Sequence, residues 1–322
     1  MSSSFSKPNS PVTEFHGMIT RSKKMMAFFE LLQRLSRTDS AVLIRGQSGT
    51  GKELAARAIH KLSPRSSMPF NAVNCAMLSQ ELATSELFGH AKGSFTGAHS
   101  DHQGYFQASN KGTLFLDEIA ELPMTVQGRL LRAIQEKSVS PLGSTKSANI
   151  DVRIVSATHK SLRQEVKALT FREDLMYRIR VVPIFLPTLS ERDGDIEVLS
   201  WRFIDEFNKL GGRHISEITQ DAREALLSYS WPGNIRELRN NIEFAFAIGD
   251  GPALNLEDLT PELRGEGPPG AETWQSIDHR RQEKQEILQA LNKAKGKKGD
   301  AAAALNMSRS TFWRKLKEHG LS

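Results

Sequence analysis

Two patterns in this sequence could do chemistry together, and the first is a glycine-rich segment. It reads GQSGTGKE, and it follows an apolar run and precedes a helical pattern. In that context the backbone N–H groups of the segment wrap phosphates, and a lysine supplies positive charge to the outer phosphates. A chance glycine-rich turn is the alternative, because Glu53 stands where Ser or Thr usually follows the lysine. We predict a phosphate site formed by Gly46, Gln47, Ser48, Gly49, Thr50, Gly51, Lys52 and Glu53.

The second pattern is an acidic pair at the end of the apolar run TLFLDEI, residues 113–119. Ligands of sheets with helices on both faces bind at the carboxyl ends of the strands, so the pair should emerge beside the phosphate loop. Asp117 would hold Mg²⁺, directly or through water, and Glu118 would orient and polarise the attacking water. Solvated acids at a strand end are the alternative, which the four apolar residues before them disfavour. Together the two patterns predict ATP hydrolysis, with ATP and Mg²⁺ as ligands.

The elements that would position these residues alternate between strand and helix patterns. Helical patterns at 51–63 and 124–137 lie between the apolar runs, and Pro183 and Pro187 break the alternation. This order predicts the α/β class, with a parallel sheet covered by helices. Short apolar runs that end in turn or polar residues predict buried strands at 40–46, 70–75, 112–118 and 152–158.

The rest of the chain divides by composition. After the alternating region, apolar spacing becomes helical with no strand-like run, and a stretch rich in Gly and Pro then predicts a flexible linker. We expect a polar tail at 1–14, an α/β ATPase subdomain at 15–187, an all-helical lid at 188–264, a linker at 265–275 and a helical DNA-binding domain at 276–322.

Composition indicates ordinary globular material, with 39% hydrophobic and 25% charged residues in a chain of 322. The single cysteine, Cys75, lies among apolar neighbours, so we expect a buried, inert thiol in a reducing compartment. No segment has the apolar length of a signal peptide core or a membrane span. We therefore expect a cytoplasmic protein without membrane insertion.

The net charge of +6 is concentrated at one end of the chain. Residues 276–322 hold eleven Lys and Arg against five Asp and Glu, so the whole excess lies there and the preceding residues balance. A solvated basic helix is the alternative, but this is where a polyanion would bind.

The same end reads as a helix, a turn near 306–308 and a second helix. Ala301, Ala304 and Leu305 would give the first helix an apolar face, and Phe312 and Leu316 would give the second its buried side. Ser308 can cap the second helix, and we expect Trp313 to pack or to contact the DNA backbone. This pattern predicts a helix-turn-helix whose DNA contacts are Arg309, Ser310, Thr311, Arg314 and Lys315. A helical hairpin that binds protein is the alternative.

With these motifs in view, the chain from about residue 15 onwards resembles the AAA+ bacterial enhancer-binding proteins, transcription activators that act on sigma-54 RNA polymerase. GTGKE in the phosphate loop is usual in that family, and GSFTGA at 93–98 is close to its hallmark GAFTGA. The end of the chain resembles the family's Fis-type helix-turn-helix. Further shared segments are ELFGH at 86–90, FREDLMYRI at 171–179 and WPGNIREL at 231–238.

The resemblance implies roles for individual residues near the nucleotide. Asn74 would restrain the catalytic glutamate until nucleotide is bound, and Thr158 and His159 would sense the terminal phosphate. Arg236 would be the sensor arginine of the lid. Arg172 and Arg178 would be fingers supplied to a neighbouring subunit, which implies a ring, hexameric by resemblance.

The resemblance also implies partners. Two of them are the sigma-54 RNA polymerase holoenzyme and enhancer DNA. Relatives carry a receiver domain before the ATPase, whereas few residues precede it here. We therefore also expect a separate inhibitory or regulatory protein. Phe95 in isolation predicts a loop residue folded onto the core, whereas its place in the ATPase predicts a tip that nucleotide state raises and lowers. The sigma-54 contact would then consist of Gly93, Ser94, Phe95, Thr96, Gly97 and Ala98.

Two functions of other classes remain as alternatives. One is a DNA-binding regulator whose accessory ATPase does not act on sigma-54. The other is an AAA+ protein-remodelling ATPase, which the hallmark segment and the terminal DNA module disfavour.

Overall fold

The computed structural model describes residues 4–5, 12–94, 99–266, 286–291, 293–294, 297–305 and 307–318. The chain divides into two compact units, Met1–Thr260 and Pro261–Ser322, and we describe each by itself. Within the described residues no helix is both long enough and apolar enough to cross a bilayer.

A five-stranded parallel sheet forms the centre of the α/β region, in the order β10-β4-β9-β6-β5. Four strands confirm the sequence prediction: β4 (Val42–Arg45), β5 (Phe70–Asn74), β6 (Thr113–Asp117) and β9 (Arg153–Thr158).

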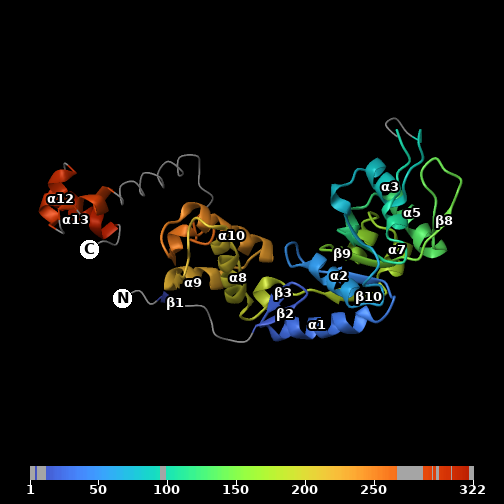
Figure 1. Cartoon of the computed structure of the whole chain (residues 1–322), viewed down its shortest axis with the longest axis horizontal. Coiled ribbons are helices and arrows are strands. Elements are labelled where there is room, and N and C mark those ends of the chain that lie inside the picture. Colours follow the sequence, from blue (N-terminus) through green and yellow to red (C-terminus); the bar gives the residue numbers. More distant parts are fainter. Residues whose placement is uncertain are drawn as a thin grey trace. The chain divides into compact units, whose positions relative to one another are not determined.

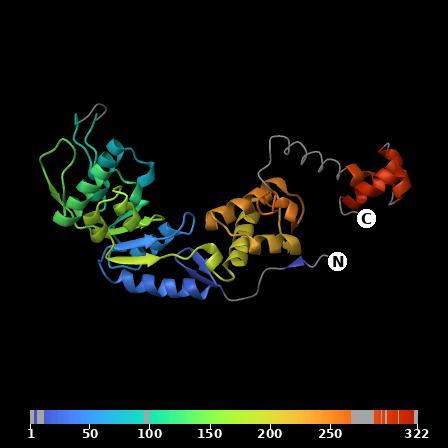
Figure 2. The same cartoon turned by 180° about the vertical axis from the view of Figure 1, so that it is seen from behind.

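The fifth strand, β10 (Val182–Phe185), was missed because Pro183 seemed to end the alternation. Pro183 lies opposite Leu43 in the parallel pair of β10 with β4, and Figure 2 shows these two arrows side by side. Because β10 is an edge strand, the missing N–H of Pro183 leaves no ladder partner unsatisfied on its open side.

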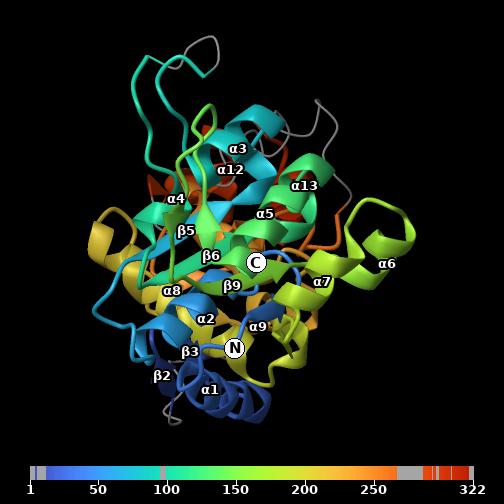
Figure 3. The same cartoon turned by 90° about the vertical axis from the view of Figure 1, so that its right-hand side faces the viewer.

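Helices cover both faces of the sheet, as the predicted fold class requires (Figure 3). Phe115 of β6 packs with α1 (Lys23–Ser36) and α2 (Lys52–Lys61) on one face. Its neighbours Leu114 and Leu116 pack on the opposite face. The helices there are α3 (Gln80–Phe88), α5 (Met124–Glu136), α6 (Leu162–Lys167) and α7 (Glu173–Ile179).

Smaller elements complete this region. They are the hairpin of β2 (Thr13–Phe15) and β3 (Met18–Thr20), the hairpin of β7 (Ser138–Val139) and β8 (Ala148–Asn149), the short helix α4 (Tyr105–Ala108), and the 3₁₀ turns η1 (Cys75–Met77) and η2 (Ile119–Glu121).

The lid that follows is mainly helical (Figure 1). Its helices are α8 (Asp195–Leu210), α9 (Gln220–Ser228) and α10 (Asn234–Ile248), with 3₁₀ turns η3 (Leu189–Glu191) and η4 (Leu256–Asp258). The expectation of a lid without strands was wrong. A small sheet joins β1 (Ser4–Phe5), β11 (Glu217–Thr219) and β12 (Ala253–Leu254), strands too short to show an alternating pattern.

The carboxyl-terminal unit contains α12 (Lys298–Ala304), α13 (Arg309–Glu318) and a helical stretch at 286–291. Phe312 and Leu316 are buried as predicted. Ala301 is buried and Leu305 packs partly buried against the same cluster, as predicted, whereas Ala304 is exposed and Ala302 is buried in its place. Most of the expected linker at 265–275 lies outside the described residues.

Candidate active site

The phosphate loop, residues 46–53, joins β4 to α2 at the carboxyl edge of the sheet. Gly49 and Gly51 have φ angles of 77° and 99°, in the left-handed region where a side chain would be strained. The Gly46 N–H donates to the Thr158 carbonyl at 3.3 Å, which ties the loop to β9. The segment therefore has the strand–loop–helix context that phosphate binding by such a motif requires.

Lys52 and Glu118 form an ion pair at the centre of this edge. The Lys52 ammonium lies 2.9 Å from Glu118 Oε1, and it also donates to the Gly46 carbonyl at 3.2 Å. Lys52 is only 7% exposed. Glu118 has φ 50° and ψ 49°. This left-handed conformation is uncommon for a non-glycine residue, and it ends β6 and begins η2.

His159 holds the other oxygen of Glu118. The ring Nδ1 lies 2.7 Å from Glu118 Oε2, and the His159 backbone N–H donates to the same oxygen at 3.2 Å. Burial by itself would raise the pKa of Glu118, but the bonds from Lys52 and then His159 outweigh it and hold that pKa below its usual value. The carboxylate is therefore kept ionised and bound on both oxygens.

The restraining role that the family resemblance implies for Asn74 stays a prediction, and Asn74 has another hydrogen-bond partner in this structure. Asn74 lies opposite Asp117 in the register of β5 with β6, but its Oδ1 accepts from the Ala76 N–H at 3.0 Å. In the part of the chain that the structure describes, Glu118 is bonded to Lys52 and His159. The Glu118 carboxylate thus lies between Lys52 of the phosphate loop and His159, which follows β9.

Asp117 is the second acid of the pair. Its Oδ1 accepts from the Glu118 N–H at 3.1 Å. Burial raises the pKa of Asp117, and Lys52 opposes that effect. Cys75 is 1% exposed, and burial first, then the charges of Asp117 and Glu118, raise the pKa of its thiol far above the usual range. The predicted buried thiol is confirmed.

The lid contacts the phosphate loop directly through the start of α10. Arg236 donates to Ser48 Oγ at 3.1 Å, and the Ile235 N–H donates to the Gly49 carbonyl at 3.1 Å. A Cβ at Gly49 would lie 2.2 Å from the Gly233 carbonyl oxygen. Only glycine therefore fits where the lid meets the loop, and the predicted sensor arginine lies beside the loop.

Two residues that sequence reasoning missed join the lid to the loop. Asn234 is fully buried at φ 53°, donates to the Ser48 carbonyl at 3.0 Å and accepts from the Leu189 N–H at 2.8 Å. Arg192 donates to the Thr50 carbonyl at 2.8 Å, and burial lowers its pKa to about 10. Asn234 lies within the WPGNIREL segment and could have been found there, whereas nothing near Arg192 marked it.

Replacing Asn234 with Ala should lower the free energy of unfolding by about 2 kcal/mol or more. The change leaves the buried Leu189 N–H and Ser48 carbonyl without partners and places Ala in a left-handed conformation. Urea unfolding measures the loss, and ATP affinity should weaken with it. Asn240→Ala, at an exposed position on the same helix, is the matched control. Equal losses of unfolding free energy in the two variants would contradict the role of Asn234 in joining the lid to the loop.

The two predicted finger arginines lie on α7 and at its start. The Arg172 N–H donates to Oε1 of the buried Gln127 at 2.8 Å, and its guanidinium pairs with Asp174 at 2.8 Å. Arg178 is exposed in the last turn of α7. Within the described residues, neither side chain is hydrogen-bonded to the phosphate loop of its own chain.

The hallmark segment is described only at its start. Gly93 has φ 80°, Ser94 is half-buried, and residues 95–98 lie outside the described residues. A Cβ at Gly143 would lie 2.7 Å from the Cβ of Ser94, so the loop between β7 and β8 packs against the segment.

Backbone pairs join these two loops at their base. His90 pairs with His102 and with Leu142, and the Ala91 N–H donates to the Leu142 carbonyl at 2.9 Å. Figure 3 shows both loops extending from the same side of the α/β region. Sequence reasoning had not associated the second loop with the first.

The predicted DNA-contacting residues lie on α13. The Thr311 N–H donates to Ser308 Oγ at 3.2 Å, so Ser308 caps the helix as predicted. The side chains of Arg309, Ser310 and Arg314 lie outside the described residues. Trp313 is 53% exposed, with the Lys298 ammonium 4.2 Å from its ring centroid. One face of the ring therefore carries the Lys298 ammonium, and the exposed remainder shows that Trp313 is not part of the domain core.

Comparison with known families agrees with this arrangement. Residues 18–185 match the sigma-54 interaction domain, residues 190–275 match the AAA+ ATPase lid domain, and residues 280–319 match the bacterial regulatory proteins of the Fis family. The three matches follow one another along the chain in the predicted order.

Individual relatives match nearly the whole of this chain and about two thirds of their own length. The chain is 42% identical to the regulatory protein AtoC of Escherichia coli K12, over 94% of this chain and 68% of that protein. It is also 42% identical to the transcriptional regulatory protein ZraR of Klebsiella oxytoca, over 95% of this chain and 71% of that protein. The crystal structure of NtrX from Brucella abortus in complex with ATP superposes with a TM-score of 0.70 at 34% identity, covering 94% of this chain and 69% of that one.

One chain thus combines three features. They are the ion pair of Lys52 with Glu118, the lid arginine at the phosphate loop and the capped terminal helix pair. The chain belongs to the sigma-54-dependent transcription activators, AAA+ ATPases that carry a Fis-type DNA-binding domain.

Proposed function

We propose that this ATPase binds enhancer DNA upstream of a promoter and remodels the closed complex of the sigma-54 RNA polymerase holoenzyme into an open complex. The observation that carries the proposal is the ion pair of Lys52 with Glu118. It joins the lysine that would bind phosphate to the acid that would activate water. Outer phosphates that attract Lys52 would leave one oxygen of Glu118 free for water.

Mg²⁺ fits this site through Asp117. In the described part of the chain no group of three or more His, Cys, Asp or Glu could form an all-protein metal cage. Mg²⁺ does not need one, since it is usually held by one or two carboxylates, waters and substrate phosphates. The bound ion would neutralise charge on those phosphates, and Asp117 would orient it.

The active assembly is a ring, hexameric by family resemblance. Each nucleotide would receive Arg172 and Arg178 from the neighbouring subunit, because neither is hydrogen-bonded to the phosphate loop of its own chain within the described residues. DNA contacts would come from Arg309, Ser310, Thr311, Arg314 and Lys315 of α13, joined by the exposed face of Trp313.

Transcription in vitro tests the proposal. Open complexes should form on a sigma-54 promoter with ATP, and should not form with a non-hydrolysable analogue or with polymerase carrying another sigma factor. Open complexes that form equally with the analogue would contradict it and favour the regulator with an accessory ATPase.

Phe95→Ala and Thr96→Ala should each abolish open-complex formation and leave ATP turnover within about threefold of the unmodified protein. These residues belong to neither the phosphate loop nor the acidic pair, so neither should be needed for hydrolysis. The parallel measurement of ATPase and promoter opening checks this, and Ser100→Ala is the control. ATPase that falls in step with promoter opening would give the segment a structural role.

A further inference from the structure

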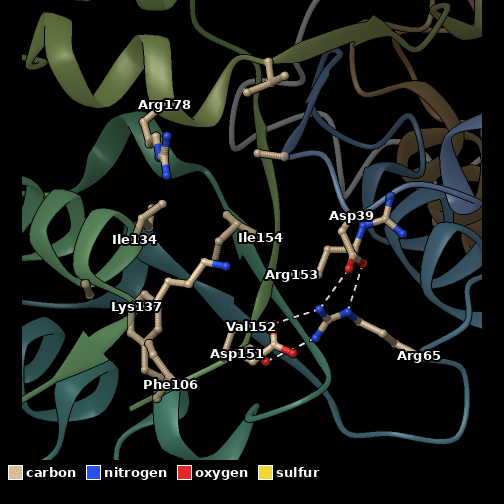
Figure 4. A pocket seen from close by; sticks show the side chains of 14 residues that line it. Asp39, Arg65, Phe106, Ile134, Lys137, Asp151, Val152, Arg153, Ile154 and Arg178 are labelled. Atoms are coloured by element: carbon tan, nitrogen blue, oxygen red, sulfur yellow. Dashed lines mark hydrogen bonds and ion pairs between the residues drawn. The ribbon is translucent and has the colours of Figure 1, made fainter. Parts of the chain in front are cut away.

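A second cavity lies at the opposite edge of the sheet from the nucleotide site. It has a volume of about 220 Å³. Asp39 and Ala41, just before β4, and Asp151 and Val152, just before β9, line it. These are the amino ends of parallel strands, whereas the phosphate loop follows the carboxyl end of β4. Figure 4 shows the cavity with its charged side chains.

The acids of this cavity are already paired. Arg65 forms two hydrogen bonds to Asp39, both 3.0 Å, and its guanidinium reaches Asp151 at 2.9 Å. The guanidinium of Arg65 holds the pKa of Asp39 below its usual value, so that acid stays ionised in the pair. One cation therefore uses both acids that line the cavity.

Three other cations line the same space, and none forms an ion pair with a carboxylate among the described residues. They are Lys137, at the end of α5, and Arg153 and Arg178. Figure 4 shows Lys137 and Arg178 extending toward the hollow from different helices. The positive charge at the cavity thus exceeds the charge that its own acids neutralise.

Arg153 is the buried member of this set. It is 2% exposed, and its terminal nitrogens donate to the carbonyls of Leu35 and Ser36 at 2.8 and 3.3 Å. Among the residues that the structure describes, its Nε has no hydrogen-bond partner. Burial lowers the pKa of this arginine, which reflects the cost of keeping a buried cation without a directly bound acid.

The remaining wall is apolar. Phe106, Ile134, Ile150 and Val181 line it, so the space suits a small molecule with an apolar body and an anionic group. A fully hydrated inorganic ion would leave that wall without contacts.

We propose that this cavity binds a small organic anion, whose carboxylate or phosphate group is held by Lys137 and Arg178 while its body packs on the apolar wall and the buried charge of Arg153 adds to the positive potential. Arg178 connects the cavity to catalysis, and this part rests on the proposed function. An anion bound to Arg178 would compete with the neighbouring subunit's nucleotide for the same guanidinium, so it would slow ATP turnover in the ring.

Calorimetric titration tests the binding site with Mg²⁺ and ADP present in saturating amounts, so that the phosphate loop is occupied. The probes are phenyl phosphate and benzoate, which share an apolar body and differ in their anionic group, and neutral benzamide is the control ligand. We expect at least one anion to bind and benzamide not to bind. The tighter anion identifies the preferred group.

The variant Lys137→Gln should weaken the Kd of that anion about tenfold or more, since it removes one charge-assisted hydrogen bond. Lys167→Gln, an exposed lysine away from the cavity, should leave the Kd unchanged. Equal binding of benzamide or an unchanged Kd in Lys137→Gln would each overturn the site. Anion binding without slower turnover would leave the site in place and overturn the competition for Arg178.

Discussion

Glu118→Gln should reduce ATP turnover by about 10²- to 10⁴-fold and leave ATP binding intact, the loss expected for removal of a general base. The amide keeps the shape of the side chain and cannot take a proton from water. Because Gln has no charge to hold Lys52, whose ammonium lies 2.9 Å from Glu118 in the unmodified chain, ATP affinity should be equal or higher.

The geometry explains why this residue controls the step. Both oxygens of Glu118 are bound, one by Lys52 and one by His159. Oε2 accepts two bonds from His159, which leaves Oε1 for water, and the Lys52 ammonium lowers the basicity of that oxygen until the bond is released. The outer phosphates of a nucleotide attract Lys52. Nucleotide binding should therefore break the ion pair of Lys52 with Glu118.

Glu121→Gln is the matched control for this variant. Glu121 ends the same 3₁₀ turn, but its carboxylate pairs with Lys160 at 2.8 Å, near the surface. Single-turnover hydrolysis and a separate nucleotide-binding assay would distinguish chemistry from affinity. Turnover of Glu118→Gln equal to that of Glu121→Gln would show that another group activates the water.

Much of the site was predictable because its residues are local in sequence. The phosphate loop and the acidic pair each follow an apolar strand, and parallel strands end at the same edge. That alone places Lys52 near Asp117 and Glu118. The burial of Phe312 and Leu316 was also predictable, since residues four apart share one side of a helix.

The parts that failed depend on tertiary geometry. The partner of Glu118 is His159, which follows β9, and no local pattern marks that pairing. β10 was missed because the tolerance of Pro183 depends on which strand is at the edge of the sheet. Arg192 reaches the Thr50 carbonyl from a position 142 residues away, and its role is a property of the folded lid.

Arg172→Ala should lower ATP turnover by about 10³-fold or more without loss of nucleotide binding or folding, since a finger in trans contributes that much to phosphoryl transfer. The structural cost should be small. Arg172 pairs with Asp174 on the surface, with both side chains more than 40% exposed, and such pairs contribute little to stability. Arg163→Ala, an exposed arginine on α6, is the matched control.

Mixing two inactive variants tests whether the arginine acts on a neighbouring subunit. A subunit with Arg172→Ala retains its own Lys52 and Glu118, and a subunit with Lys52→Ala retains Arg172. If the finger acts in trans, a mixed ring contains interfaces at which an intact phosphate loop faces an intact arginine, so turnover should reappear on mixing. An arginine that merely pairs with Asp174 in its own chain gives no such recovery, because neither subunit then supplies what the other lacks.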